Sequence, residues 1–181
     1  MPEPGHPVGP ISEAEKIGSD RANQFRTFGS AYALEHATRP STIGFVLGAN
    51  PVSLLSWIGE KFLDWSDEAP PLDVILAAVS LYWFTDCAAT ALYPYRHLFA
   101  PGIVGAHENP AWYCKKPFGY SWFPKELAPI PKAWAETTGN LVFYRQHDSG
   151  GHFAAVEKPD ELWADIEAFV KQVWSGPKAA N

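Results

Sequence analysis

Residues 141–153 read LVFYRQHDSGGHF, and this stretch indicates the fold class most clearly. Its first four residues are apolar without alternation, which is typical of a parallel strand covered on both faces. A Gly-Gly turn and a histidine follow, and a helical pattern begins after Pro159. We expect that helix to bury its apolar residues, which are Leu162, Trp163, Ile166, Phe169, Val170 and Val173. The order of strand, turn and helix indicates an α/β fold.

The sequence before this stretch divides into two parts. A second apolar run, Pro117 to Phe123, predicts another strand, and residues 100–116 have the mixed polar and turn-forming composition of a long loop. Before the loop we expect helices from Glu13 to His36, after Pro51 and after Pro71. The sequence therefore predicts a helical layer followed by an α/β region.

Composition excludes several classes of protein. The chain has 181 residues, 46% of them hydrophobic, which suffices for one globular domain and excludes a disordered protein. Its 14 basic and 20 acidic residues give a net charge of −6, without a basic cluster that could follow a phosphate backbone. We therefore expect no nucleic-acid partner. Cys87 and Cys114 lack metal-ligand spacing and are expected to be buried thiols, with a bridge between them left open.

Neither a secretion signal nor a membrane-spanning segment is evident in the sequence. Residues 1–10 have no basic start and no apolar stretch, unlike a signal peptide. The longest apolar segment, Val74 to Phe84, is shorter than the roughly 18 residues that a membrane-spanning helix needs. We expect a soluble, cytoplasmic protein without a membrane span.

Two ionisable residues follow the two predicted strands. Glu126 comes after the first strand and His152 after the second, where α/β enzymes place catalytic side chains. A carboxylate bound to one imidazole nitrogen would leave the other nitrogen free to take a proton from water. The alternative is that Glu126 is a solvated surface residue and His152 an ordinary loop residue. Asp148 could compete with Glu126, and Ser149 imitates half of a serine nucleophile motif.

Four segments resemble the microsomal and fungal epoxide hydrolases of the α/β-hydrolase superfamily, and the resemblance extends from Ser12 to Trp174. The segments are AYALEHATRPSTIG at 31–44, WIGEKF at 57–62, KPFG at 116–119 and GGHFAA at 150–155. The resemblance implies the C-terminal part of an α/β-hydrolase fold with a helical lid. It implies three parts: a disordered tail at 1–11, the lid at 12–100 and the C-terminal part of the core at 101–181.

The resemblance also implies roles for four residues. His152 falls on the family's catalytic histidine and Glu126 on its acid, while Tyr32 and Tyr95 fall on two lid tyrosines that hydrogen-bond the epoxide oxygen. Phenol donors suit this task because ring opening places negative charge on that oxygen. The alternative is that both tyrosines are ordinary packed rings, Tyr32 with Phe25 and Phe28. A small apolar epoxide is the implied substrate, with no cofactor and no metal.

One component of the family's mechanism has no match in the sequence. The aspartate nucleophile of a Gly-x-Asp-x-Gly turn and the His-Gly-x-Pro loop are both absent, and Asp20 lies within a predicted helix. We therefore expect a partial chain that is inactive alone, completed by another chain or prone to self-association through its unpaired strand edges. A non-catalytic binding module derived from the lid is the alternative. An esterase completed by a serine is a weaker one.

Overall fold

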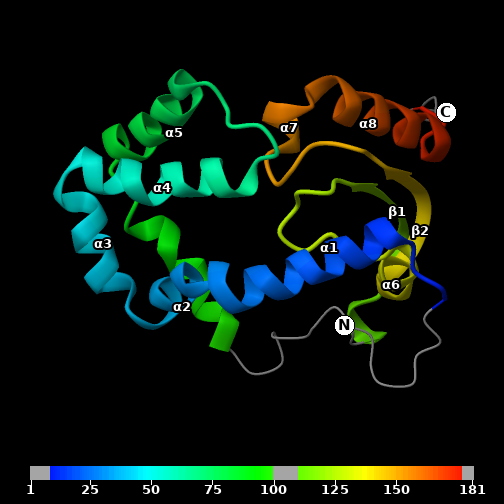
Figure 1. The fold of residues 1–181 in the computed structure, drawn as a ribbon, viewed down its shortest axis with the longest axis horizontal. Coiled ribbons are helices and arrows are strands. Elements are labelled where there is room, and N and C mark those ends of the chain that lie inside the picture. Colours follow the sequence, from blue (N-terminus) through cyan, green and yellow to red (C-terminus); the bar gives the residue numbers. More distant parts are fainter. Residues whose placement is uncertain (1–8, 100–109, 177–181) are drawn as a thin grey trace, which may run out of the picture.

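The structure, a computed structural model, describes residues 9–99 and 110–176, which form two regions joined by a long helix (Figure 1). We call residues 31–99 the helical layer and residues 110–176 the strand region. The layer contains α2 (Ala31–Thr38), α3 (Pro40–Ala49), α4 (Pro51–Trp65), α5 (Leu72–Phe84) and the 3-10 segment η2 (Thr90–Phe99). The strand region contains η4 (Pro110–Trp112), β1 (Cys114–Trp122), α6 (Lys132–Ala135), η5 (Glu136–Thr138), β2 (Gly139–Gln146), α7 (Ala154–Glu157) and α8 (Pro159–Val173).

Helix α1 (Glu13–Gln24) connects the two regions. It begins with the predicted capping box, in which Ser12 and Glu15 exchange hydrogen bonds. The other oxygen of Glu15 accepts the backbone N–H of Lys132 at 2.8 Å. A side chain at Gly18 would lie 2.9 Å from Pro129, so the helix packs directly against the chain that follows β1. These contacts attach α1 to the strand region before it runs toward α2 (Figure 1).

The expected single helix from Glu13 to His36 is wrong. The chain changes to a π-helical turn, η1 (Phe25–Gly29), and is interrupted at Ser30 before α2 begins. Phe25 folds over Gly29, where an added Cβ would lie 2.6 Å from its ring, and packs edge-on against Trp65. Phe28 is 80% exposed, so the expected aromatic stripe is not continuous.

Three prolines of the helical layer lie at the start of a helix. Pro40 begins α3, a helix that was not predicted from the sequence, directly after α2 has ended at Thr38. Pro51 likewise begins α4, as predicted, and Pro71 caps the predicted α5. Proline suits these positions because the first helical residues have no intrahelical partner for an N–H. The core of the layer consists of Ile43, Leu47, Leu54, Val79 and Leu92.

The two predicted strands are present and pair in parallel, with Phe118 opposite Leu141 and Trp122 opposite Gln146. Residues 141–144 are only half-buried, so the expected cover on both faces is wrong for this structure. Within the described residues the sheet has two strands, and β1 and β2 each have one neighbour. The parallel pairing supports an α/β arrangement.

Helix α8 is present as predicted, but its burial was predicted wrongly. Trp163 is 65% exposed, and Ile166 and Val170 are 44% and 37% exposed. Val173 is 38% exposed as well. The helix turns Asp165 inward, only 2% exposed, because Ser121, Arg145 and His147 all bind its carboxylate. Four of the six residues expected to be buried therefore lie on the outer side, whereas Leu162 and Phe169 are half-buried.

The structure also bears on the predictions of buried cysteines and of no membrane span. Cys87 and Cys114 are both free, and Cys114 is exposed rather than buried as expected. Among residues 9–99 and 110–176, no single helix is long and apolar enough to cross a membrane. Helices α3 and α4 would pass that test only as a pair, and they meet at a 113° bend. Residues 1–8 of the expected tail at 1–11 and residues 100–109 of the expected loop at 100–116 lie outside the described residues. The remainder of that loop forms η4 and the start of β1.

Candidate active site

The structure brings His152 and Glu126 together. Nδ1 of His152 lies 2.7 Å from Oε1 of Glu126, although 26 positions separate the two residues in the chain. Both side chains are a little over one-third exposed, so the pair is accessible to water and small molecules. The two candidate partners predicted from the strand ends are therefore in contact.

The strands explain why these loops meet. The parallel ladder continues past the strand ends: the backbone N–H of His147 donates to the carbonyl of Trp122, and that of Lys125 donates to Gly150. The two loops then leave the sheet side by side. Gly150 has a φ of +102°, which glycine adopts without strain, so the chain can turn back toward Glu126 there.

The protonation states suit a general base. Burial tends to raise the pKa of Glu126, but hydrogen bonds from His152 and from the backbone N–H of Leu127 outweigh it. The charges of His152 and Arg21 add to this effect, so the pKa of Glu126 lies below its usual value. An ionised carboxylate can only accept, so Nδ1 of His152 carries a proton. In the neutral ring Nε2 is then free to accept one.

Arg21 supports the acid from α1, which the sequence analysis did not anticipate. Its guanidinium donates to the backbone carbonyls of Glu126 and Lys125, both at 2.9 Å. Five donors on a planar group allow such simultaneous contacts. Arg21 therefore fixes the backbone that presents the carboxylate.

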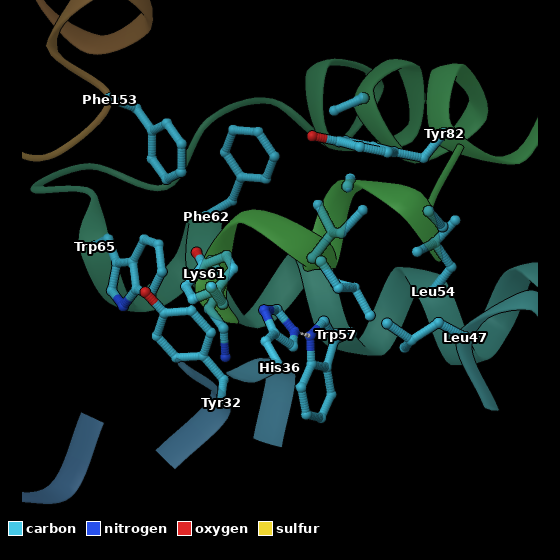
Figure 2. A pocket seen from close by; sticks show the side chains of 16 residues that line it. Tyr32, His36, Leu47, Leu54, Trp57, Lys61, Phe62, Trp65, Tyr82 and Phe153 are labelled. Carbon is cyan, nitrogen blue, oxygen red and sulfur yellow. Dashed lines mark hydrogen bonds between the residues drawn. The ribbon is translucent and has the colours of Figure 1, made fainter. Parts of the chain in front are cut away.

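A cavity of about 390 Å³ lies within the helical layer (Figure 2). Helix α4 supplies more of its wall than any other element, with further residues from α2, α3, α5, η2 and the loop that carries His152, which we call the histidine loop. Most lining side chains are apolar or aromatic, including Leu47, Leu54, Phe62 and Tyr82. Phe153, next to His152, closes one end by stacking on Phe62 at 4.4 Å between ring centroids. An apolar small molecule fits such a space.

Tyr32 and Tyr95 share a wall of this cavity. Their ring centroids are 5.8 Å apart, and both rings are partly exposed. Burial, followed by hydrogen bonding to Tyr95, raises the pKa of Tyr32, so its hydroxyl stays a proton donor at neutral pH. The two sequence-predicted tyrosines are therefore neighbours in the structure.

Trp65 joins the tyrosines to the histidine. Its ring centroid lies 5.4 Å from that of Tyr32 and 5.2 Å from that of His152. Its backbone carbonyl accepts the N–H of His152 at 2.9 Å. Trp65 is the last residue of α4, so one helix end contacts both candidate groups. Helical periodicity alone gives no signal for this position.

His36 and Lys61 are polar residues in the same wall, and they were also missed. Trp57 donates its indole N–H to Nε2 of His36 at 2.9 Å, which leaves the proton of the neutral ring on Nδ1. Burial, then the charge of Lys61, lowers the pKa of His36. The Lys61 ammonium lies 4.8 Å from the ring centroid of Tyr32, a cation-π contact.

Other residues considered from the sequence lie apart from this arrangement. Glu126 rather than Asp148 contacts His152, and Asp20 is an exposed residue of α1. Within the described part of the chain, no three His, Cys, Asp or Glu side chains group as a metal site would require.

A solved structure with a similar fold indicates the class of protein. The structure of Aspergillus niger epoxide hydrolase matches with a TM-score of 0.85 and 49% sequence identity, over 96% of this chain and 45% of that one. That protein is an α/β-hydrolase. The fold of the present chain is therefore that of part of an α/β-hydrolase, consistent with a C-terminal part.

Sequence relatives then give the family. A Dothistroma septosporum protein that bears an epoxide hydrolase name is 49% identical in an alignment of 180 positions, which covers 94% of this chain and 42% of that protein. Epoxide hydrolase 1 of Sus scrofa is 31% identical in an alignment of 154 positions, which covers 78% of this chain and 34% of that protein. No family model matches the chain. The chain is homologous to epoxide hydrolases over most of its length, and it spans less than half the length of these relatives.

Proposed function

We propose that this chain supplies the water-activating pair and the oxygen-binding tyrosines of an epoxide hydrolase, an enzyme that converts an epoxide to a vicinal diol through an ester. The observation that supports this proposal most strongly is the 2.7 Å contact between His152 and Glu126. The same pair touches, through Trp65, a cavity wall that contains both tyrosines. The names of the relatives agree with this function.

In the proposed reaction, a carboxylate attacks one carbon of the epoxide and the carbon–oxygen bond to the ring oxygen breaks. Tyr32 and Tyr95 donate hydrogen bonds to that oxygen as it gains charge, and one of the two phenols transfers its proton to convert the oxygen to a hydroxyl; the carboxyl group released later supplies the proton that restores the phenol. His152 then takes a proton from water through Nε2, and the hydroxide attacks the ester carbonyl. The bond between the acyl carbon and the diol oxygen breaks, the imidazolium returns its proton to that oxygen, and the diol leaves the free carboxyl group behind. Glu126 stabilises the imidazolium that forms.

We propose that the attacking carboxylate comes from polypeptide other than residues 1–181. The sequence contains no Gly-x-Asp-x-Gly motif, and a nucleophile of this type needs such a turn to expose its side chain. The exposed outer face of α8 and, within the described residues, the single neighbour of each strand are consistent with a missing partner surface, whether on the same polypeptide or on a separate chain. The 181-residue chain should therefore not turn over an epoxide alone.

A hybrid protein tests this proposal. Residues 12–174 would replace the matching segment of the Aspergillus niger protein, where 49% identity favours correct packing. The isolated chain should form no diol from styrene oxide above the buffer rate, whereas the hybrid should form it. Diol formation by the isolated chain that persists in a Glu126→Gln, His152→Gln variant would reject the assignment of both residues.

The tyrosines are tested in the same hybrid. Replacing Tyr32 and Tyr95 together with Phe keeps both rings in the cavity wall and removes only the hydroxyls. The rate of ring opening in a single turnover should fall by about 100-fold or more, in line with the loss of oxyanion donors in other enzymes. Phe28→Leu, a change to an exposed ring outside the cavity, serves as the control. Unchanged ring opening in the double variant would show that both tyrosines only pack.

The cavity also supports a second candidate, a non-catalytic binding module for apolar small molecules. It is enclosed largely by the helical layer, so binding would not require the sheet. An isolated chain that binds 1-phenylethane-1,2-diol tightly, together with a hybrid that remains inactive, would favour this candidate over the enzyme.

A further inference from the structure

Two loops far apart in the sequence exchange hydrogen bonds through a pair of carboxylates. One loop begins at Trp65, the last residue of α4, and extends to residue 68. The other is the histidine loop, which comprises residues 150–157 and includes α7. We propose that Asp67 and Glu157 are positioning residues that hold His152 against Glu126 and join the histidine loop to the helical layer. This inference rests on the proposed function only in that it concerns the same histidine.

Each carboxylate binds the backbone of the opposite loop. Oδ2 of Asp67 accepts the N–H of Gly150 at 3.0 Å, and Oε2 of Glu157 accepts the N–H of Asp67 at 2.6 Å. The backbone N–H of His152 donates to the carbonyl of Trp65 between these two bonds. Hydrogen bonds to a charged acceptor are stronger than neutral ones, so the two carboxylates dominate this connection.

The two loops are so close that no side chain fits between them. A Cβ at Gly151 would lie 2.4 Å from the carbonyl oxygen of Trp65 and 3.1 Å from the backbone nitrogen of Asp67. The backbone atoms of the loops therefore touch at Gly151, one residue before His152. Any change in the path of residues 65–68 must move the histidine.

Nearby contacts support the same connection without replacing it. Lys158 pairs with Glu68 at 3.5 Å across the loops, but the Glu68 side chain is 80% exposed, so this pair contributes little. Phe62 and Phe153 stack, which adds apolar contact between α4 and the histidine loop. Neither contact is directional enough to set the position of the His152 backbone.

The acid of the pair is held by a different part of the molecule. Arg21, from α1, binds the backbone at Lys125 and Glu126, whereas Asp67 and Glu157 bind the loop of His152. The 2.7 Å contact between His152 and Glu126 therefore depends on two independent supports. Loss of the Asp67 support should loosen the histidine while the acid keeps its place.

The test uses the full 181-residue chain and does not involve turnover. Asp67→Ala removes the acceptor for Gly150, Asp67→Asn keeps an acceptor of the same shape, and Asp64→Ala removes an exposed carboxylate one turn earlier as the control. The measurements are the NMR signal of the Nδ1 proton of His152 and the hydrogen-exchange protection of the Gly150 and His152 amides.

Asp67→Ala should broaden or lose the Nδ1 proton signal and lower protection of both amides by about tenfold. Asp67→Asn and Asp64→Ala should keep the signal and stay within about threefold of the original protection. A purely structural role would lower protection across the chain and leave the Nδ1 signal intact wherever the protein is folded. Asp67→Ala with an unchanged Nδ1 signal and unchanged His152 protection would overturn the inference.

The unmodified chain gives a second test that does not depend on the folding of a variant. The amides of Asp67 and His152 should exchange through one common opening, with equal free energies and equal responses to low denaturant. Exchange of His152 through a separate, more frequent opening would overturn the inference. Because neither measurement needs diol formation, an inactive hybrid would count against the proposed function and leave this inference standing.

Discussion

The helical layer and the strand region differ in the side chains at their centres. The layer packs aliphatic residues around an apolar cavity, with Leu47 and Leu54 each only 2% exposed. The strand region instead places the charged Asp165 at its centre and leaves Trp163 and Ile166 on the surface. The helical layer thus has an apolar core of its own, whereas the strand region combines buried Trp122 and Phe123 with a buried charge and an exposed apolar face on α8.

This difference bears on the division of roles between the regions. An apolar cavity selects small apolar molecules, and the layer can form it from its own residues together with Phe153. A charged network at the end of a sheet fixes the direction of the loops that follow. Here those loops present Glu126 and His152. One region therefore suits binding, and the other suits the geometry of proton transfer.

The strongest test of the comparison removes the buried charge. Asp165→Ala leaves Arg145 and His147 without their carboxylate, and breaking a buried pair from one side costs about 3–5 kcal/mol in the free energy of unfolding. Urea unfolding should show this loss. Glu167→Ala, on the exposed side of α8, should change the value by about 0.5 kcal/mol or less. Equal effects would mean that Asp165 does not organise the strand region.

Truncation of an apolar residue in each region sharpens the comparison. Leu54→Ala should lower the free energy of unfolding by about 2–4 kcal/mol because it creates a cavity in a packed core. Ile166→Ala, on the outer face of α8, should lower it by about 0.5 kcal/mol or less in the monomer. Urea unfolding at low protein concentration measures both. A cost for Ile166 near that for Leu54 would show that the outer face is covered.

A pair of glycines tests the boundary between the regions. Gly151→Ala should lower the free energy of unfolding by about 1–3 kcal/mol, since its methyl group would clash with the carbonyl of Trp65. Gly48→Ala, in α3 with open space around it, should raise the value by about 0.5 kcal/mol. Thermal and urea unfolding would measure the expected loss of stability in the first variant and the expected gain in the second. A neutral Gly151→Ala would contradict the close contact between the loops.

The smallest effect expected is a pH dependence of the helical layer. The pKa of His36 is lowered by burial and by Lys61, so the unfolded chain binds a proton before the folded chain as pH falls below about 6.5. The free energy of unfolding should then fall toward pH 5, with a contribution of at most about 1.4 kcal/mol per pH unit.

A matched variant isolates this contribution. His36→Gln can still accept the indole N–H of Trp57 but cannot titrate. The difference between the two proteins, measured by urea unfolding from pH 8 to pH 5, should therefore shrink as pH falls. Glu126 and Asp165 have pKa values below their usual values of about 4, so their protonation changes the free energy of unfolding mainly at a lower pH than this range. A pH-independent difference would reject the assignment to His36.

The sequence predicted the features that depend on local patterns. The strands near Phe118 and Leu141, helices α4 and α8 and the meeting of Glu126 with His152 all follow from apolar runs and from the direction of parallel strands. The break at Phe25–Gly29 was missed because the apolar spacing continues across it. The orientation of α8 was missed because the apolar stripe was expected to turn inward, whereas the partners of Asp165 hold that carboxylate inward instead.

The supporting residues of the site could not be predicted because each acts across a long sequence distance. Arg21 lies 105 positions from Glu126, and Asp67 lies 83 positions from Gly150. Both bind backbone atoms, so neither partner's side chain gives a signal in the sequence. Trp65 was similarly hidden, since its role depends on the end of α4 reaching the histidine loop.

The most direct test of the central proposal is mass spectrometry of the hybrid protein with His152→Gln. Without its base the protein should open styrene oxide once and accumulate the ester. The mass should then increase by one epoxide molecule, carried on a peptide outside residues 1–181. An unmodified protein that still forms diol, or an adduct on a residue within 1–181, would contradict the proposed division between nucleophile and water-activating pair.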